Sequence, residues 1–173
     1  MDKPVPDSIR LKQDVVENVT WTPEVEIRNC QVSRIPTRGF LVTTRRKVVV
    51  ENNTFTRLPM PSILIADDAR SWFESGMIRD VLMQGNHFME DSSPAIAIEP
   101  EVLQPDRQNP VHQNIRIEKN DFELQCGPIV LARAVQGLSI IDNTFDIRDH
   151  SSEALIELIP FLNRYYTIQR DVF

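Results

Sequence analysis

The stretch Val50-Glu51-Asn52-Asn53-Thr54-Phe55 decides the fold of this chain, because its pattern returns along the sequence. Each copy holds an apolar residue, two mostly polar residues, Asn, a polar residue and a large apolar residue. Four further copies occupy residues 27–32, 83–88, 117–122 and 140–145. The last residues of successive copies lie 23, 33, 34 and 23 positions apart, so a basic period near 23 is lengthened twice. Repeats of this length predict a solenoid.

Short strands are expected around every copy. Apolar, largely β-branched runs lead into the copies at residues 48–50, 81–83, 115–117 and 138–140, and a second series follows at 40–43, 63–66, 96–99, 129–132 and 155–158. Such residues favour strands, and two or three strands in a period of about 23 residues leave no room for a helix. This is the length of one coil of a parallel β-helix, whose neighbouring coils lie about 4.8 Å apart. We therefore predict an all-β, single-stranded parallel β-helix of about five to six coils.

The repeated Asn has a physical role in that fold. A coil must turn sharply between its strands, and Asn both tolerates left-handed backbone angles and hydrogen-bonds to neighbouring main chain. Stacked turns then predict a ladder of Asn side chains, in which Cys30 takes the first place as a structural thiol. The large apolar residue two places later is expected to point inward. These residues form one column of the core, namely Val32, Phe55, Phe88, Phe122 and Phe145.

One domain accounts for the whole sequence. Residues 1–22 are predicted to form an irregular lead-in, and residues 23–160 the coils, with loop insertions at 66–78 and 99–113. Residues 161–173 are predicted to form a C-terminal strand or cap. The N-terminal region shows no capping element, and an uncapped solenoid exposes core strands at its ends. We therefore expect a segment of a longer protein, or self-association through uncapped β-helix ends.

Composition limits the classes of function. A chain of 173 residues that is 41% hydrophobic can bury a core, and a net charge of −6 with a pI near 5.1 argues against nucleic acid or an anionic membrane as the main partner. No stretch is long enough to span a membrane, and residues 1–20 lack the pattern of a signal peptide. Cys30 and Cys126 fall on different coils, so we expect no disulfide. His87 has no second His or Cys in register, and His112 and His150 are placed in loops, so we expect no metal site and no cofactor.

Alignment of the second series of runs gathers four carboxylates on one edge. It places Thr43, Ala66, Glu99 and Ala132 in one column, Thr44, Asp67, Pro100 and Arg133 in the next, and Arg45, Asp68, Glu101 and Ala134 in a third. Acids on neighbouring coils would then lie roughly 5 to 9 Å apart. This range covers the carboxylate separations of both retaining and inverting glycosidases. Mutual repulsion is expected to raise the pKa of at least one acid, as a general acid working near neutrality requires.

The same acids also have a structural interpretation. Asp68 can cap a short helix over residues 69–74, Asp67 can close a turn, and Glu99 and Glu101 can be loop surface beside Pro100. Capping is the commoner role for a single Asp in such a place. Four clustered acids, however, repel one another and cost stability, which favours a functional interpretation of the group.

The first insertion and a neighbouring coil supply candidates for substrate binding. Trp72 offers an apolar platform for a sugar face, or fixes the loop on the coil beneath. Arg70 and Arg133 can orient carboxylates or bind hydroxyls, although each can equally form a surface ion pair of little energy. With Glu74 they make up the predicted substrate-binding set.

Three runs of the sequence resemble the β-helix of the α-galactosidases of glycoside hydrolase family 110. They are residues 39–55, residues 63–76 with 79–81, and residues 97–101, and the similarity covers most of residues 14–160. The most specific element is the loop Asp67-Asp68-Ala69-Arg70-Ser71-Trp72-Phe73-Glu74-Ser75-Gly76. The resemblance implies a right-handed parallel β-helix. It also implies an inverting, metal-independent exo-enzyme that removes terminal α-1,3-linked galactose from glycans such as the blood-group B determinant.

The resemblance extends to individual residues. Asp67 and Asp68 resemble the base side of the family's site, and Glu101 or Glu99 resembles its general acid. The implied partner is a galactose-terminated oligosaccharide or glycan, and the implied location is secreted or periplasmic. Family members are several times longer than this chain, so walls of the substrate groove are expected to come from additional coils.

Two other functions agree with the sequence. A non-catalytic β-helix module for glycan binding or assembly fits the short chain and the missing cap. A polysaccharide lyase would gather acids on one face in order to hold calcium. The acidic patch would repel the acidic polymer that a lyase cleaves, so we rank the lyase lowest.

Overall fold

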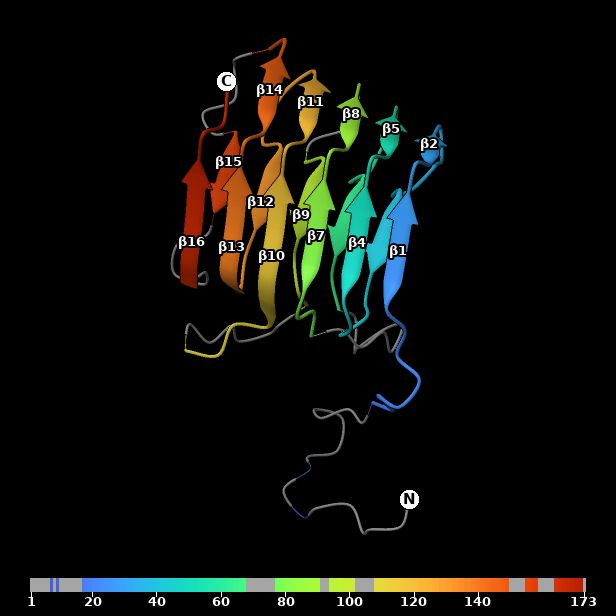
Figure 1. Cartoon of the computed structure of the whole chain (residues 1–173), viewed down its shortest axis with the longest axis vertical. Coiled ribbons are helices and arrows are strands. Elements are labelled where there is room, and N and C mark those ends of the chain that lie inside the picture. The colour runs from blue at the N-terminus through green and yellow to red at the C-terminus, as the bar shows by residue number, and fades with distance from the viewer. Residues whose placement is uncertain are drawn as a thin grey trace.

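The computed structural model describes residues 7, 9, 17–67, 77–90, 94–101, 108–149, 155–158 and 164–172, and the described residues form strands and turns but no helix. The strands build three sheets (Figure 1). The first sheet contains β1 (Val25–Arg28), β4 (Val48–Glu51), β7 (Val81–Gln84), β10 (His112–Glu118), β13 (Val135–Ile141) and β16 (Arg164–Gln169). The second contains β2 (Gln31–Ser33), β5 (Thr54–Thr56), β8 (His87–Met89), β11 (Asp121–Leu124) and β14 (Thr144–Ile147). The third contains β3 (Phe40–Val42), β6 (Ile63–Ile65), β9 (Ile96–Ile98), β12 (Val130–Ala132) and β15 (Ile156–Leu158).

The order of the strands shows a solenoid. Every strand from β1 to β13 pairs in parallel with the strand three places later in the chain, so three successive strands make one coil and the next coil stacks upon it. In Figure 1 the first sheet runs from β1 in blue to β16 in red without a change of direction. The predicted all-β parallel β-helix is therefore confirmed.

The predicted core column is present. The rings of Phe55, Phe88, Phe122 and Phe145 stack with centroid separations of 4.9, 4.6 and 5.2 Å, and Val32 lies in register before them. These distances are close to the spacing of neighbouring strands, so each coil adds one ring to a continuous stack. The first sheet also has the predicted register, with Val48 opposite Val81 and Ile115 opposite Leu138.

The predicted Asn ladder is also present, and each Asn joins three coils. Asn120 accepts hydrogen bonds at Oδ1 from the backbone N–H (2.9 Å) and the Nδ2 (3.0 Å) of Asn86. Its own Nδ2 donates to the carbonyl of Met83 and to Oδ1 of Asn143, both at 3.0 Å. All four ladder Asn side chains are buried. The ladder runs through Cys30, Asn53, Asn86, Asn120, Asn143 and Asp171.

The backbone of the ladder differs from the prediction. The left-handed residue is not the ladder Asn but the residue before it, as at Asn52 (φ 54°), Gly85 (φ 63°) and Lys119 (φ 55°). Asn52 and Lys119 are exposed, which explains why that place accepts a long charged side chain. The following residue is Asn because of its side-chain hydrogen bonds, and not because of its tolerance of positive φ.

The structure reveals a sixth copy of the repeat, which the sequence pattern did not identify. Residues 168–173 follow the pattern with Asp171 in the Asn place, 28 residues after Asn143, and Arg170 before it is left-handed (φ 56°). Oδ1 of Asp171 accepts from the backbone N–H (2.7 Å) and the Nδ2 (2.9 Å) of Asn143, as an Asn would. Oδ2 is buried and has no hydrogen-bond partner among the described residues.

The register of the third sheet corrects one predicted alignment. Ile96 pairs with Val130 and Ile98 with Ala132, whereas the sequence alignment matched Ile96 with Ile129. The run 129–132 is apolar at every position, so no alternation of polar and apolar residues fixes its register. Ala132 faces the core and is buried, while Leu131 is partly exposed. Each predicted column is therefore wrong by one residue in the fourth coil.

The two cysteines are unpaired, as predicted. Cys30 is exposed at the first ladder place, where its backbone N–H donates to Oδ1 of Asn53 (3.0 Å) and its Sγ donates to the carbonyl of Arg28 (3.3 Å). Cys126 follows β11, and it is partly exposed.

Replacing Asn120 by Ala is expected to lower the free energy of unfolding by on the order of 3 kcal/mol, because it leaves the N–H of Asn86 and the carbonyl of Met83 buried without partners. Urea denaturation followed by circular dichroism measures this loss. Gln31→Ala removes an exposed amide on β2 and serves as the control. Equal, small losses in both variants would show that the ladder contributes little.

Replacing Asp171 by Asn is expected to raise the free energy of unfolding by about 1 kcal/mol. The new Nδ2 supplies a donor where the buried Oδ2 has no partner, and the other ladder Asn side chains donate to a carbonyl from that place. Asp142→Asn is the control, because it only removes an exposed ion pair with Arg170, which contributes little. A stability for Asp171→Asn at or below that of Asp142→Asn would contradict the prediction.

Candidate active site

Three of the four predicted acids are described, and they lie in the segments that follow neighbouring strands of the third sheet. Glu99 directly follows β9, Asp67 lies two residues after β6, and Arg133 directly follows β12. Because Ile65, Ile98 and Ala132 are in register, Ala66, Glu99 and Arg133 form one column and Thr44, Asp67, Pro100 and Ala134 the next. Glu99 therefore has Arg133 beside it on the next coil, where the sequence alignment had placed Ala132.

Asp67 and Glu101 are held together across two coils. The backbone N–H of Glu101 donates to Oδ1 of Asp67 (2.9 Å) and lies 3.4 Å from the Asp67 carbonyl. The N–H of Glu99 donates to the carbonyl of Ile65 (2.9 Å). Residues 99–101 thus continue the pairing with the preceding coil beyond the end of the sheet. The Asp67 carboxylate thus also organises the backbone between neighbouring coils.

Arg133 supports the same edge from the next coil. Its Nη2 donates to the carbonyl of Pro100 (2.8 Å), and its backbone N–H donates to the carbonyl of Ile98 (3.0 Å). Pro100 is buried, and the Arg133 side chain is half-buried. The guanidinium therefore fixes the short run between Glu99 and Glu101 and brings a positive charge beside these carboxylates.

This edge offers three carboxylates of different exposure. Asp67 and Glu99 are half-buried, while Glu101 is exposed. Coils are spaced by about 4.8 Å, and an offset of one or two residues along the chain widens the separation of carboxylates on neighbouring coils to as much as roughly 9 Å. The upper part of this range suits the acid and the base of an inverting glycosidase, which lie about 6.5 to 9.5 Å apart. Within the described ranges, no group of three or more His, Cys, Asp or Glu side chains is arranged to hold a metal ion.

Four predicted site residues lie outside the described residues. They are Asp68, Arg70, Trp72 and Glu74, all from the first insertion. Their roles stay predictions, as do the roles assigned to Asp67, Glu99, Glu101 and Arg133.

A second polar group lies at the other end of the two insertions. Asp80 accepts at Oδ1 from Nδ2 of Asn114 (3.1 Å) and from Nη2 of Arg116 (3.3 Å). The sequence analysis gave these residues no role. The repeat pattern could have revealed this group, because the register of Val81 with Ile115 places Asp80 directly beside Asn114 on the next coil.

His112 was placed in a loop, but it is the first residue of β10 and is fully buried. Its Nδ1 accepts from the backbone N–H of Ile78 (3.3 Å), so the ring carries its proton on Nε2, which has no partner among the described residues. The N–H of Gln113 donates to the Ile78 carbonyl (2.8 Å). These bonds join the chain that leaves the first insertion to the chain that leaves the second.

Comparison with known proteins places this chain in a family. The chain is 49% identical over 149 residues to alpha-1,3-galactosidase A of Bacteroides fragilis, an alignment that covers 83% of this chain and 25% of that protein. It is 42% identical over 166 residues to alpha-1,3-galactosidase A of Bacteroides thetaiotaomicron, covering 94% of this chain and 29% of that protein. It is 44% identical over 143 residues to alpha-1,3-galactosidase B of the same species, covering 78% of this chain and 23% of that protein. No family model matches the chain.

The fold and the polar edge define a parallel β-helix protein with acids at the ends of one sheet. The chain is a homologue of one segment of the alpha-1,3-galactosidases, and the predicted resemblance is confirmed. It spans about a quarter of the length of these relatives. The described residues contain no helix, and hence none that is long and apolar enough to cross a membrane.

The stability of the fold is expected to depend on the protonation of His112. Burial lowers the pKa of His112 from 6.5 to about 4. The imidazole therefore binds its second proton more tightly in the unfolded chain than in the folded one. The contribution of neutral His112 to the free energy of unfolding is full above pH 6.5, and it falls by up to about 3 kcal/mol as the pH drops from 6.5 to about 4.

Urea denaturation at a series of pH values measures this dependence. His112→Asn is the matched variant, because its Oδ1 can accept from Ile78 while its side chain does not titrate. The slope of stability between pH 6.5 and about 4 should be smaller in His112→Asn than in the unmodified chain. Identical slopes would assign the acid sensitivity to other groups.

Proposed function

We propose that this chain is the acid-carrying segment of an inverting exo-α-galactosidase, which hydrolyses terminal α-1,3-linked galactose from glycans. One observation carries the proposal. In a chain similar to proteins named alpha-1,3-galactosidase, Asp67 and Glu101 lie on neighbouring coils, and the backbone N–H of Glu101 donates to Oδ1 of Asp67 at 2.9 Å. Glu99 and Arg133 lie on the same edge.

The proposed mechanism uses acids on neighbouring coils. Asp67 or Asp68 activates a water molecule on one face of the sugar, and Glu101 or Glu99 protonates the leaving oxygen on the other. Attack by water at the anomeric carbon with departure of the glycosidic oxygen gives β-galactose and the shortened glycan. Arg133, which holds the carbonyl of Pro100, keeps the two glutamates of this run in place.

Substrate contacts are proposed for residues on the insertion and the edge. Arg70, Trp72 and Glu74 come from the first insertion, in which Trp72 supplies an apolar surface for the sugar ring. The galactose-terminated glycan is the partner that these groups suit. A secreted or periplasmic location is proposed for the parent protein, as the resemblance to glycoside hydrolase family 110 implies.

A second candidate function rests on a specific observation. Because the chain spans about a quarter of the length of its relatives, walls of the substrate groove can belong to coils outside it. In that case the chain is a β-helix module that binds glycan, or takes part in assembly, without turnover. Such a module would keep its sugar affinity when a single acid is neutralised.

Incubation of the chain with an α-1,3-galactosyl oligosaccharide, followed by proton NMR, tests the proposed activity. Galactose is expected to appear first as the β-anomer. Asp67→Asn keeps the Oδ1 acceptor for Glu101 but loses the charge, and Glu101→Gln keeps the shape, so both should fold normally. Replacing an acid that acts as base or general acid should lower the rate of galactose release by about 10²- to 10⁴-fold.

Matched variants make the test specific. Asp121→Asn neutralises an exposed acid on the second sheet, away from this edge, and is expected to leave the rate unchanged. Full activity in all of Asp67→Asn, Asp68→Asn, Glu99→Gln and Glu101→Gln would refute the assigned site. A folded chain that binds the oligosaccharide but releases no galactose would favour the binding module.

A further inference from the structure

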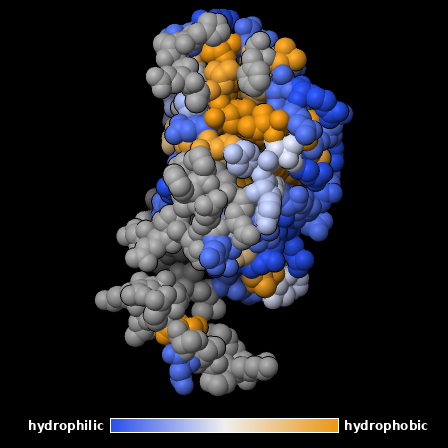
Figure 2. Space-filling view, turned by 90° about the vertical axis from the view of Figure 1, so that its left-hand side faces the viewer, coloured by the Kyte–Doolittle hydropathy of each residue, from blue (hydrophilic) through white to orange (hydrophobic). Residues whose placement is uncertain are grey.

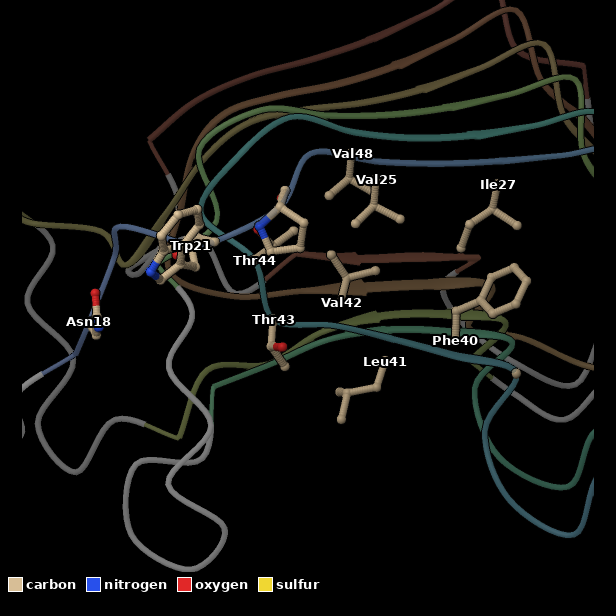
Figure 3. A pocket seen from close by; sticks show the side chains of 13 residues that line it. Asn18, Trp21, Val25, Ile27, Phe40, Leu41, Val42, Thr43, Thr44 and Val48 are labelled. Atoms are coloured by element: carbon tan, nitrogen blue, oxygen red, sulfur yellow. The ribbon is translucent and has the colours of Figure 1, made fainter.

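The turn that leads from the third sheet to the first carries the acids at one end and a second polar group at the other. In Figure 1 this turn lies along the lower side of the solenoid, where β7, β10 and β13 begin. On the fourth coil it consists of Arg133 and Ala134 alone, so the two sheets approach closely there. Figure 3 shows the same turn on the first coil, where Thr43 and Thr44 follow β3 and Val48 begins β4.

The register of the strands gives the separation of the acids from the second polar group. Ala134 lies in the column of Asp67, and Gly137 lies in the column of Asp80. Three residues separate these two columns, so their backbones are at most about 11 Å apart. The carboxylates on either side of a sugar in an inverting glycosidase lie about 6.5 to 9.5 Å apart, which is a similar distance. Side chains from both columns can therefore contact one bound glycan.

Asp80 is held in position by both neighbouring coils. Its carbonyl accepts from the backbone N–H of Val48 (2.9 Å), and its Oδ1 accepts from Nδ2 of Asn114 (3.1 Å) and Nη2 of Arg116 (3.3 Å). The side chains of Asp80 and Arg116 are 35% and 36% exposed, and Asn114 is exposed. The group is thus both fixed and accessible.

The group also has hydrogen-bonding capacity that the described part of the chain does not use. Within the described ranges, Oδ2 of Asp80 and Oδ1 of Asn114 accept no hydrogen bond, and Nε of Arg116 is buried without a partner. Carboxylate and amide oxygens beside a guanidinium match the hydroxyl groups of a sugar, each of which donates and accepts. Figure 2, in which the outer face of the first sheet forms the right-hand side, shows mainly hydrophilic residues there. This face therefore suits a polar, uncharged ligand.

The polar group occurs on the same connections as the acids. Asp80 ends the connection that contains Asp67, and Asn114 follows the connection that contains Glu101. On the next coil the equivalent place holds Gly137, and the turn before it carries no carboxylate. An ion pair as exposed as that of Asp80 contributes little to stability, so structural support alone does not account for the group.

We propose that Asp80, Asn114 and Arg116 form a subsite that binds hydroxyl groups of the glycan beside the acids. The identity of this ligand rests on the proposed function. Oδ2 of Asp80 and Oδ1 of Asn114 accept hydrogen bonds from sugar hydroxyls, and the Nη atoms of Arg116 donate to hydroxyl oxygens. The subsite lies in a different column from the acids, so it determines which glycan binds and leaves the rate of bond cleavage to the acids.

Titration of the isotope-labelled chain with an α-1,3-galactosyl oligosaccharide, followed by NMR chemical shifts, measures the Kd. Asp80→Asn keeps an oxygen acceptor for Asn114 and Arg116 but loses the charge, so it should fold normally. Its Kd should rise by about 10- to 100-fold, as expected when hydrogen bonds to a charged group are lost. Asn114→Gly should raise the Kd severalfold. Its backbone remains unstrained, because Gly adopts the left-handed conformation of Asn114 (φ 52°) freely, as Gly137 (φ 75°) does on the next coil.

Asp142→Asn is the matched control and should leave the Kd unchanged. Asp142 also pairs with an arginine and its side chain is 32% exposed, but it lies at the ladder turn, away from the acids. Separate titrations with galactose and with the shortened glycan show which sugar the subsite contacts, since Asp80→Asn should weaken the binding of that sugar alone. Circular dichroism melting verifies that each variant is folded.

The outcomes separate this subsite from the proposed activity. An unchanged Kd in both Asp80→Asn and Asn114→Gly would overturn the subsite, and galactose release by those variants at the full rate would leave the proposed activity standing. A folded, unmodified chain that binds none of these sugars would also overturn the subsite. Weaker binding in both variants of a chain that releases no galactose would support the subsite and refute the hydrolysis. In an active chain, KM should rise by the same factor as the Kd while kcat changes little.

Discussion

The Asn ladder is the interaction on which the rest of this structure depends. Each ladder side chain accepts from the coil before it and donates both to that coil and to the coil after it. The bonds are buried, so a coil that shifted in register would leave several polar groups unsatisfied at once. The ladder therefore fixes the registration of every coil, and the stacked Phe rings two residues away follow from it.

The ladder fixes the length of the turn between the first and second sheets. It does not fix the length of the turn between the third and first sheets. Between the first and second sheets every connection has two residues, such as Asn52 and Asn53, because the ladder requires them. Between the third and first sheets the connection ranges from residues 133–134 alone to residues 66–80. The insertions, Asp67, Glu99, Glu101 and Asp80 all belong to these variable connections. The length and residues of these connections can vary without disturbing the core, so this edge is free to carry different functional groups.

The stacked coils also hold the residues of this edge in defined positions, although these residues lie outside regular strands. Glu101 and Asp67 continue the pairing of β9 with β6, and Arg133 adds a bond to Pro100 from the next coil. His112 holds Ile78, so the far ends of both insertions are anchored as well.

The sequence by itself determined the coil period, the parallel β-helix, the Asn ladder and the Phe column, because each depends on a pattern repeated five times. Tertiary structure alone decided the register of residues 129–132, since four consecutive apolar residues fit the core in either register until Ala132 packs beneath Ile98. It also decided the burial of His112 and the ladder role of Asp171. Those two residues differ from their equivalents on other coils, and only the stacking of coils around them gives each its surroundings.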